Sequence, residues 1–366
     1  MQRTKPPFRA DHVGSLLRPA ALKAAREKRA KGEIGTAELK AVEDREIKDV
    51  IKKQEAAGLQ SITDGEFRRS WWHLDFLWGL DGVERHVMDT GIAFAVVTTR
   101  NEGVKVSGKL GFSGHPMIEH FKFVKANTAR TPKMTIPAPS ALYGRPVATP
   151  IDKSIYPKLD NFFADLGQAY RKAVRAFADA GCRYLQLDEV FIAMLCDPKY
   201  RQQMKDRGDD PQALGTIYGD LINVAISDIP PDMTVTMHLC RGNYKSTFMG
   251  AGGYDAMQEV LFDRIKVHGD FMEYDTARAG GFEPLVRLQK GRAAVLGLVT
   301  TKTGALEGKD AIKRRIEEAA SFADLDQLCL SPQCGFASTE EGNILAEDEQ
   351  WAKLRMIGAV AREVWG

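Results

Sequence analysis

Apolar side chains recur every three or four positions in several stretches of the chain, which is the spacing of an amphipathic helix. The spacing predicts helices over residues 36–57 and 159–180, which are followed by the helix-ending glycines Gly58 and Gly181. A similar stripe near the end of the chain, residues 351–365, predicts a last helix. The chain therefore carries long amphipathic helices along its length.

Short apolar segments that end in polar residues lie between the helical stretches and have the length of buried strands. They are His12–Ser15, Leu59–Asp64, Lys133–Pro137, Arg183–Asp188, Thr234–His238, Asp270–Glu273, Ala293–Thr300 and Gln327–Ser331. This alternation of strands and helical connections predicts an α/β fold of the (β/α)8 TIM barrel type. A doubly wound open sheet stays as the alternative, because strand number alone does not exclude it.

No tandem repeat, low-complexity tract or long linker interrupts the 366 residues. We therefore expect one catalytic barrel domain over residues 1–366. Residues 93–112 have the pattern of a β-hairpin, which predicts an insertion before the third barrel strand.

Composition narrows the class of protein without changing the predicted fold. Hydrophobic residues make up 44% of the chain and charged residues 27%, which is ordinary for a globular protein. The net charge of +2 is too small to recruit nucleic acid or an anionic membrane. The N-terminus lacks the apolar stretch of a secretory signal, and no run approaches the roughly 20 apolar residues of a membrane span. We therefore expect a cytoplasmic protein.

The five cysteines are an odd number and are widely spaced, which argues for free thiols in a reducing compartment. Cys182, Cys196 and Cys329 have neighbours typical of a helix end or a strand interior, and we interpret them as core residues. Cys240 and Cys334 stand instead at strand ends.

Polar residues gather where the predicted strands end. These ends read HVGS, ITDGE, LQLDE, TMHLC, FMEYD, VTTK and LSPQC. In barrel enzymes the carboxyl ends of the strands carry the chemistry. We therefore expect acidic, thiol and imidazole groups to converge on one rim, where a metal ion could bind.

His238 and Cys240 form an H-x-C pair, and strand alternation puts both side chains on one face. Imidazole and thiolate suit zinc, and a catalytic zinc site needs three or more protein ligands with one exchangeable position. Cys334 in SPQCG is the natural third ligand, and Glu273 could supply an oxygen that a substrate displaces. The alternative is a buried histidine beside inert core cysteines.

Two acidic strand ends indicate the kind of substrate. Zinc with two thiolates would hold a substrate thiol as a thiolate near neutral pH, although a free thiol has a pKa of about 8.5. Glu66 in DGE and Asp188 in LDE could each accept a hydrogen bond from the α-amino group of such a thiol. Helix capping or an arginine partner would explain the same carboxylates structurally.

Six motifs that span nearly the whole chain occur in one order: FRADHVGSLLRP, ITDGEFRRSWW, YLQLDEV, MHLC, FMEYDTAR and SPQCGFAS. This ordered set resembles the C-terminal catalytic half of cobalamin-independent methionine synthase and its short single-barrel relatives. The resemblance implies a (β/α)8 barrel that moves a methyl group from 5-methyltetrahydrofolate to zinc-bound homocysteine. The zinc ligands that it implies are His238, Cys240, Glu273 and Cys334. The residues that it implies for the amino-acid part of homocysteine are Ser15, Glu66 and Asp188.

Three features depart from the family pattern. Full-length methionine synthases carry an additional N-terminal barrel that helps to bind the folate, and this chain has none, which leaves the methyl donor open. The family places a proton-donating histidine after the seventh strand, where this chain reads VTTKTG and offers Lys302. The segment RGNYKSTFMGAGGYD, with Arg241 and Asn243, is longer than in the synthase and predicts an active-site loop. Asp275 stands close enough to Glu273 to compete as the oxygen ligand.

We therefore predict a zinc-dependent thiol methyltransferase with Zn²⁺ as cofactor, homocysteine as acceptor and Lys302 as the catalytic proton donor. Its expected partners are a small-molecule thiol and a methyl donor, with neither nucleic acid nor membrane; a homo-oligomer is compatible with the sequence. One alternative keeps the zinc thiolate and changes the electrophile to an epoxide or another alkyl donor, as in coenzyme M transferases. Another is a zinc-binding barrel without turnover.

Overall fold

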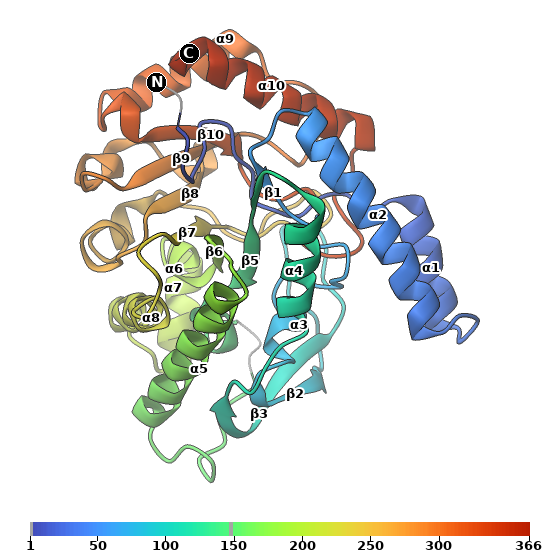
Figure 1. The fold of residues 1–366 in the computed structure, drawn as a ribbon. Coiled ribbons are helices and arrows are strands. Elements are labelled where there is room, and N and C mark those ends of the chain that lie inside the picture. The colour runs from blue at the N-terminus through green and yellow to red at the C-terminus, as the bar shows by residue number, and fades with distance from the viewer. Residues whose placement is uncertain (1–2, 146–148) are drawn as a thin grey trace.

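The architecture is a parallel barrel surrounded by helices, seen in a computed structural model that describes residues 3–145 and 149–366 (Figure 1). Within those residues a six-stranded parallel sheet follows chain order. Its strands are β5 (Met134–Pro137), β6 (Tyr184–Glu189), β7 (Thr234–Leu239), β8 (Gly269–Glu273), β9 (Ala293–Val299) and β10 (Leu328–Pro332). The pairing places Asp188 of β6 directly beside His238 of β7. The predicted barrel class is confirmed.

Two short pieces of chain complete the barrel wall. β1 (Ser61–Ile62) pairs in parallel with β4 (Thr131–Pro132), which leads into β5. Ala10 forms a parallel bridge with Leu330 of β10. The predicted first strand, His12–Ser15, is therefore misplaced, because the pairing with β10 falls just before it. The chain leaves the wall at Gly14, whose φ of 137° suits glycine, and carries Ser15 to the rim.

Helices cover the outside of the barrel (Figure 1). The α-helices are α1 (Ala20–Ala30), α2 (Thr36–Ala56), α3 (Leu74–Leu77), α4 (Met117–Asn127), α5 (Leu159–Asp179), α6 (Phe191–Met194), α7 (Pro198–Asp206), α8 (Pro211–Ala225), α9 (Lys309–Ala320) and α10 (Glu347–Trp365). The predictions of α2, α5 and α10 are confirmed, and in α5 the stripe of Phe162, Leu166 and Tyr170 is buried as its spacing requires. Among the described residues, no helix is both long and apolar enough to cross a membrane.

An antiparallel pair of strands is inserted before β5. It consists of β2 (Asp81–Val87) and β3 (Glu102–Gly111), so the hairpin predicted at residues 93–112 contains β3 and misses β2. β2 reads DGVERHV and has no buried residue, so it lacks the apolar alternation that marks a half-buried strand. The connecting segment, residues 88–101, reaches the loop after β7, where the N–H of Ala95 donates to the carbonyl of Phe248 (2.9 Å).

A buried ion pair holds the first segment of the chain inside the barrel. The ammonium of Lys133 lies 3.4 Å from Asp11, and neither side chain is exposed to solvent. Asp11 also accepts hydrogen bonds from the hydroxyls of Ser61 (2.7 Å) and Tyr184 (2.8 Å). Buried charges need such partners to offset their desolvation. The network fixes the residues that lead to Ser15.

Candidate metal centre and substrate pocket

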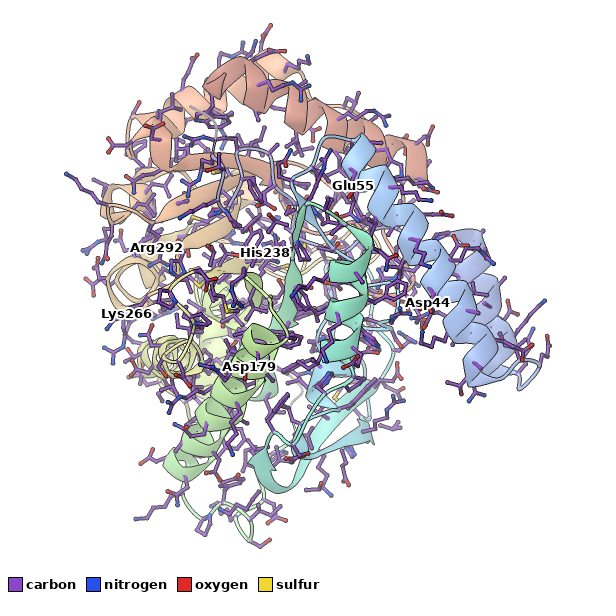
Figure 2. The ribbon with its side chains drawn as sticks, in the orientation of Figure 1. Asp44, Glu55, Asp179, His238, Lys266 and Arg292 are labelled. Atoms are coloured by element: carbon purple, nitrogen blue, oxygen red, sulfur yellow. The ribbon has the colours of Figure 1, made fainter. Side chains whose placement is uncertain are left out.

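Four potential metal ligands meet at the carboxyl ends of three barrel strands. His238 lies in β7 and Cys240 follows it, Glu273 ends β8, and Cys334 follows β10. One donor atom from each side chain lies within 4.8 Å of the others, and all four residues are buried. Figure 2 shows His238 in the interior, whereas Asp44 lies on an outer helix. The structure thus brings together the four residues named from the sequence.

The chemistry of this cluster fits zinc. Sγ of Cys334 lies 3.4 Å from Nε2 of His238 and 3.5 Å from Sγ of Cys240. The hydrogen bond from Cys240 and the charge of His238 hold the pKa of Cys334 well below its usual range, although burial opposes them. Two sulfurs, an imidazole and a carboxylate form a donor set that zinc prefers.

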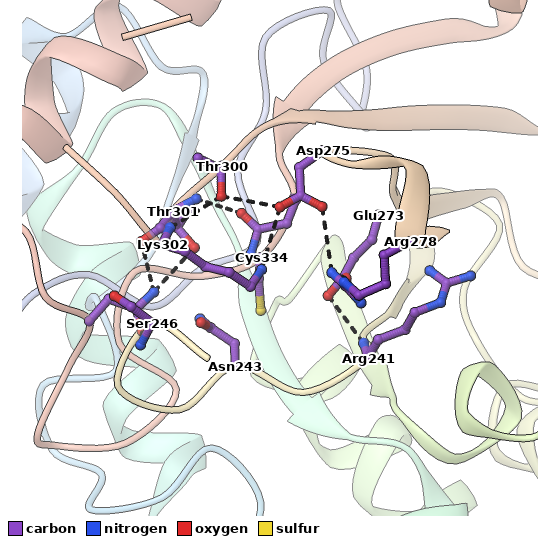
Figure 3. Close-up of polar contacts among 12 residues, drawn as sticks. Arg241, Asn243, Ser246, Glu273, Asp275, Arg278, Thr300, Thr301, Lys302 and Cys334 are labelled. Atoms are coloured by element: carbon purple, nitrogen blue, oxygen red, sulfur yellow. Dashed lines mark hydrogen bonds and ion pairs between the residues drawn. The ribbon is translucent and has the colours of Figure 1, made fainter. Parts of the chain in front are cut away.

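Glu273 is held at both carboxylate oxygens (Figure 3). Oε1 accepts a hydrogen bond from the backbone N–H of Arg241 (3.1 Å), and Oε2 pairs with Arg278 at 3.0 Å. Asp275 instead accepts a hydrogen bond from the hydroxyl of Thr300 (3.1 Å) and is absent from the four-residue cluster. The geometry therefore favours Glu273 over Asp275 as the oxygen ligand.

A pocket opens beside the cluster. Its lining includes Ser15, Glu66 and Asp188, the three residues predicted to bind substrate, together with His238 and both cysteines of the cluster. One small molecule in this pocket can therefore contact the cluster and the predicted substrate-binding residues at the same time.

Glu66 is positioned by an unusual backbone conformation and two side chains. Its φ of 61° lies in the left-handed region, which few residues other than glycine adopt. Oε1 accepts a hydrogen bond from the hydroxyl of Thr135 (2.8 Å) and lies 3.4 Å from Arg69. Oε2 is buried and has no hydrogen-bond partner among the described residues. Because a buried acceptor without a donor is unfavourable, Oε2 is ready to accept a hydrogen bond from a ligand.

Asp188 is the second carboxylate of the pocket, and Oδ1 accepts a hydrogen bond from the amide of Gln186 (2.7 Å). Burial and the charge of Glu66 raise the pKa of Asp188 to about 7, although His238 opposes them. Burial also raises the pKa of Glu66, against the opposing charge of Arg69. Two buried carboxylates disfavour each other's ionisation, and a bound ammonium group would relieve that repulsion.

Ser15 reaches the pocket beside the loop that follows β10. Its carbonyl accepts a hydrogen bond from the N–H of Phe336 (3.0 Å), and its hydroxyl accepts one from the N–H of Ala337 (3.4 Å). A Cβ atom at Gly335 would lie 1.9 Å from that hydroxyl, so glycine leaves the room that Ser15 needs. The same loop therefore supplies Cys334 and supports Ser15.

Aromatic side chains form another part of the lining. Trp72 stacks on His73 with 4.4 Å between ring centroids, and Phe94 packs against Tyr244 at 5.5 Å. Trp71 also lines the pocket. His73 was not predicted, and its only sequence signal is its place after the tryptophan pair.

Lys302 is not among the described residues that line the pocket. Its ammonium lies 3.5 Å from Asp275. Burial alone would raise the pKa of Glu273, but the charges of Lys302, Arg278 and Arg241, together with the hydrogen bond from the backbone of Arg241, lower it. Lys302 therefore acts on the electrostatics of the cluster from outside the pocket, and its role as proton donor stays a prediction.

The other three cysteines lie in the core, as their sequence neighbours predicted. Burial raises the pKa of Cys182 to about 12 and the pKa values of Cys196 and Cys329 to about 11. These thiols stay protonated at neutral pH and lie outside the four-residue cluster.

A parallel barrel with two thiols, an imidazole and a carboxylate at its rim, beside a pocket lined by buried carboxylates and aromatic side chains, is typical of metal-dependent barrel enzymes. The profile of the family described as cobalamin-independent synthase, catalytic domain, matches residues 118–362. The chain belongs to the cobalamin-independent methionine synthase family, a family of zinc-dependent methyltransferases. The resemblance read from the six motifs is confirmed.

Relatives match along nearly the whole chain. The Bacillus subtilis protein YxjH, described as uncharacterised, is 50% identical over 366 residues, which are 100% of this chain and 96% of the relative. The methionine synthase of Pyrococcus abyssi is 26% identical over 88% of this chain and 84% of its own.

Solved structures agree with the fold. A Listeria monocytogenes protein, provisionally described as a vitamin-B12 independent methionine synthase, superimposes with a TM-score of 0.80 at 41% identity over 100% of both chains. A B12-independent methionine synthase from Shewanella, in complex with selenomethionine, gives a TM-score of 0.71 at 18% identity over 96% of both chains. The second comparison supports the fold alone.

Proposed function

We propose that this protein is a zinc-dependent methyltransferase that methylates the sulfur of homocysteine to give methionine. The observation that carries the proposal is one pocket that joins a two-thiol metal cluster to the buried carboxylates of Glu66 and Asp188. Homocysteine has a thiol at one end and an α-ammonium group at the other, so one molecule can meet both features. The relatives that are named methionine synthases support the same reaction.

The four clustered residues would hold Zn²⁺, which when bound lowers the pKa of a coordinated thiol so that the thiolate is present near pH 7. Glu66 and Asp188 accept hydrogen bonds from the α-ammonium group, and Ser15 adds a polar contact at the same end of the substrate. These contacts hold the sulfur in one place, so that it is oriented for in-line displacement at the methyl carbon. Trp71 and Trp72 provide apolar surface for the methyl donor.

A thiol with an anionic tail, such as coenzyme M, fits this pocket less well. The carboxylates of Glu66 and Asp188 would repel a sulfonate, whereas they attract an ammonium group. The unpartnered Oε2 of Glu66 needs a donor, which a sulfonate does not offer. The pocket therefore favours an amino-acid thiol as acceptor.

The test is methionine formation by zinc-loaded protein. Homocysteine and coenzyme M would each be offered with 5-methyltetrahydrofolate, methylcobalamin or epoxypropane as alkyl donor. We expect methyl transfer to homocysteine and no alkylation of coenzyme M. Alkylation of coenzyme M alone, or no reaction from any pair, would contradict the proposal.

Metal content provides the second test. We expect one zinc per chain, and we expect Cys240→Ser and Cys334→Ser to lose both zinc and activity, because each removes a thiolate from the cluster. Cys196→Ser is the matched control, since Cys196 is buried away from the cluster and should leave zinc content unchanged. Full zinc occupancy in both cluster variants would remove these cysteines from the metal centre.

A further inference from the structure

Arg278 connects the metal cluster to the surrounding charges (Figure 3). It follows β8 and its side chain is only 12% exposed. Nη2 lies 3.0 Å from Oε2 of Glu273 and 3.6 Å from Asp275. Among the described residues, Arg278 is therefore the cation whose side chain pairs with the carboxylate of Glu273, whereas Lys302 pairs with Asp275 at 3.5 Å.

Arg278 also holds the loop after β7, residues 241–255. Nη1 donates a hydrogen bond to the carbonyl of Gly250 (2.8 Å), and the guanidinium lies 4.5 Å from the ring centroid of Phe248. The N–H of Gly252 donates to the carbonyl of Arg278 (2.9 Å). One side chain thus touches both Glu273 and this loop.

The same loop forms part of the thiol pocket. Its lining residues are Gly242, Asn243, Tyr244 and Met249. Asn243 also donates a hydrogen bond to the carbonyl of Gly335 (2.7 Å), next to Cys334. Displacement of this loop would therefore change both the pocket wall and the contacts of Arg278.

Charge explains why a cation is needed beside Glu273. Two thiolates and one carboxylate carry three negative charges against the two positive charges of a zinc ion. A substrate thiolate adds a fourth negative charge, and the repulsion is strong in a buried site. A guanidinium beside Glu273 offsets this negative charge. It also weakens the carboxylate as a metal ligand, because its hydrogen bond withdraws electron density from the carboxylate oxygen.

We propose that Arg278 is a positioning residue that makes Glu273 the exchangeable ligand and couples this exchange to the seating of the loop at residues 241–255. The inference rests on the proposed function. With zinc bound, Glu273 would be the ligand that gives way to the substrate sulfur, and the substrate thiol would release its proton to the solvent. Arg278 would then hold the released carboxylate through its contact of 3.0 Å with Oε2 of Glu273.

The test uses Co²⁺ in place of zinc, because absorption of the cobalt protein reports thiolate binding without turnover. Homocysteine would be titrated into wild type and Arg278→Met, which keeps the length of the side chain and removes its charge. We expect about 10-fold to 100-fold weaker thiol binding in the variant, the range for loss of a charge-assisted hydrogen bond. We also expect metal to be retained against a chelator at least as well as in wild type, since Glu273 then binds it more firmly.

Three further variants make the comparison specific. Arg278→Lys keeps the charge and should restore part of the thiol affinity, and it provides the same comparison if Arg278→Met does not fold. Arg278→Met should have no further effect on thiol affinity in a Glu273→Gln background. Arg287→Met is the matched control, because Arg287 pairs with Asp263 on the surface.

The outcomes separate the two proposals. Wild-type protein that binds no metal, or shows no thiol-dependent absorption, would refute the proposed function. Wild-type protein that binds thiol with the same affinity as Arg278→Met would refute only the role of Arg278. Hydrogen exchange of residues 241–255 should rise in Arg278→Met, and unchanged exchange would refute the coupling to the loop.

Discussion

The raised pKa of Asp188 predicts how acceptor binding depends on pH. Asp188 must be ionised to attract the α-ammonium group of homocysteine as an opposite charge. Burial and the charge of Glu66 raise its pKa to about 7, so the ionised form is lost as the pH falls through that value. The α-ammonium of a free amino acid stays charged throughout this range. The KM for homocysteine should therefore fall as the pH rises from 6 to 8.

The size of the effect follows from the pKa. The ionised fraction of Asp188 rises from about 10% at pH 6 to about 90% at pH 8, close to a tenfold change. Release of the thiol proton, whose pKa is about 8.5, also lowers KM as the pH rises. In Asp188→Asn, the pH dependence of KM that comes from the thiol remains, and the pH dependence that comes from the carboxylate is lost. At pH 8 the variant should bind homocysteine about 10-fold to 100-fold more weakly, the value of a lost charge-assisted hydrogen bond.

The assay measures initial rates against homocysteine concentration from pH 6 to pH 8, at saturating methyl donor. The ratio of the variant KM to the wild-type KM should rise about tenfold across this range. 4-Mercaptobutanoate, which lacks the α-amino group, is the control substrate and should show no such change in ratio. A constant ratio for homocysteine, or an equal change for the control thiol, would refute the assignment of Asp188 to the ammonium group.

Three other substitutions test separate parts of the site. Gly335→Ala places a Cβ atom 1.9 Å from the Ser15 hydroxyl and should turn that hydroxyl away, so we expect a severalfold higher KM for homocysteine with the zinc content unchanged. Lys133→Met leaves Asp11 buried without its cation and should lower the free energy of unfolding by about 3 kcal/mol, measured by urea denaturation; a change below about 1 kcal/mol would mean that the hydroxyl donors suffice. Lys302→Met should lower kcat at constant zinc content if Lys302 donates a proton, and an unchanged pH profile of kcat would exclude that role.

The local spacing of apolar residues was sufficient to predict those elements that bury one continuous face. The long helices were predictable because a continuous apolar stripe faces the barrel, as Phe162, Leu166 and Tyr170 show in α5. β2 was not predictable, because its side chains are exposed or half-buried and its partner strand supplies the pairing. The first barrel segment was misplaced by a few residues, because the position of its bridge to Leu330 is decided by pairing and by the buried ion pair of Asp11.

The sequence by itself determined that His238 and Cys240 share a face, since strand alternation is a property of neighbouring residues. It also determined which acidic and thiol groups stand at strand ends. Only the tertiary structure brought Cys334 within 3.5 Å of Cys240, because closure of the barrel joins positions 94 residues apart. It alone showed that Glu273 and not Asp275 belongs to the cluster, and that Arg278 contacts Glu273. It also showed that Oε2 of Glu66 has no donor within residues 3–145 and 149–366. These contacts depend on the packing of segments that are distant in the sequence, which a local sequence pattern does not predict.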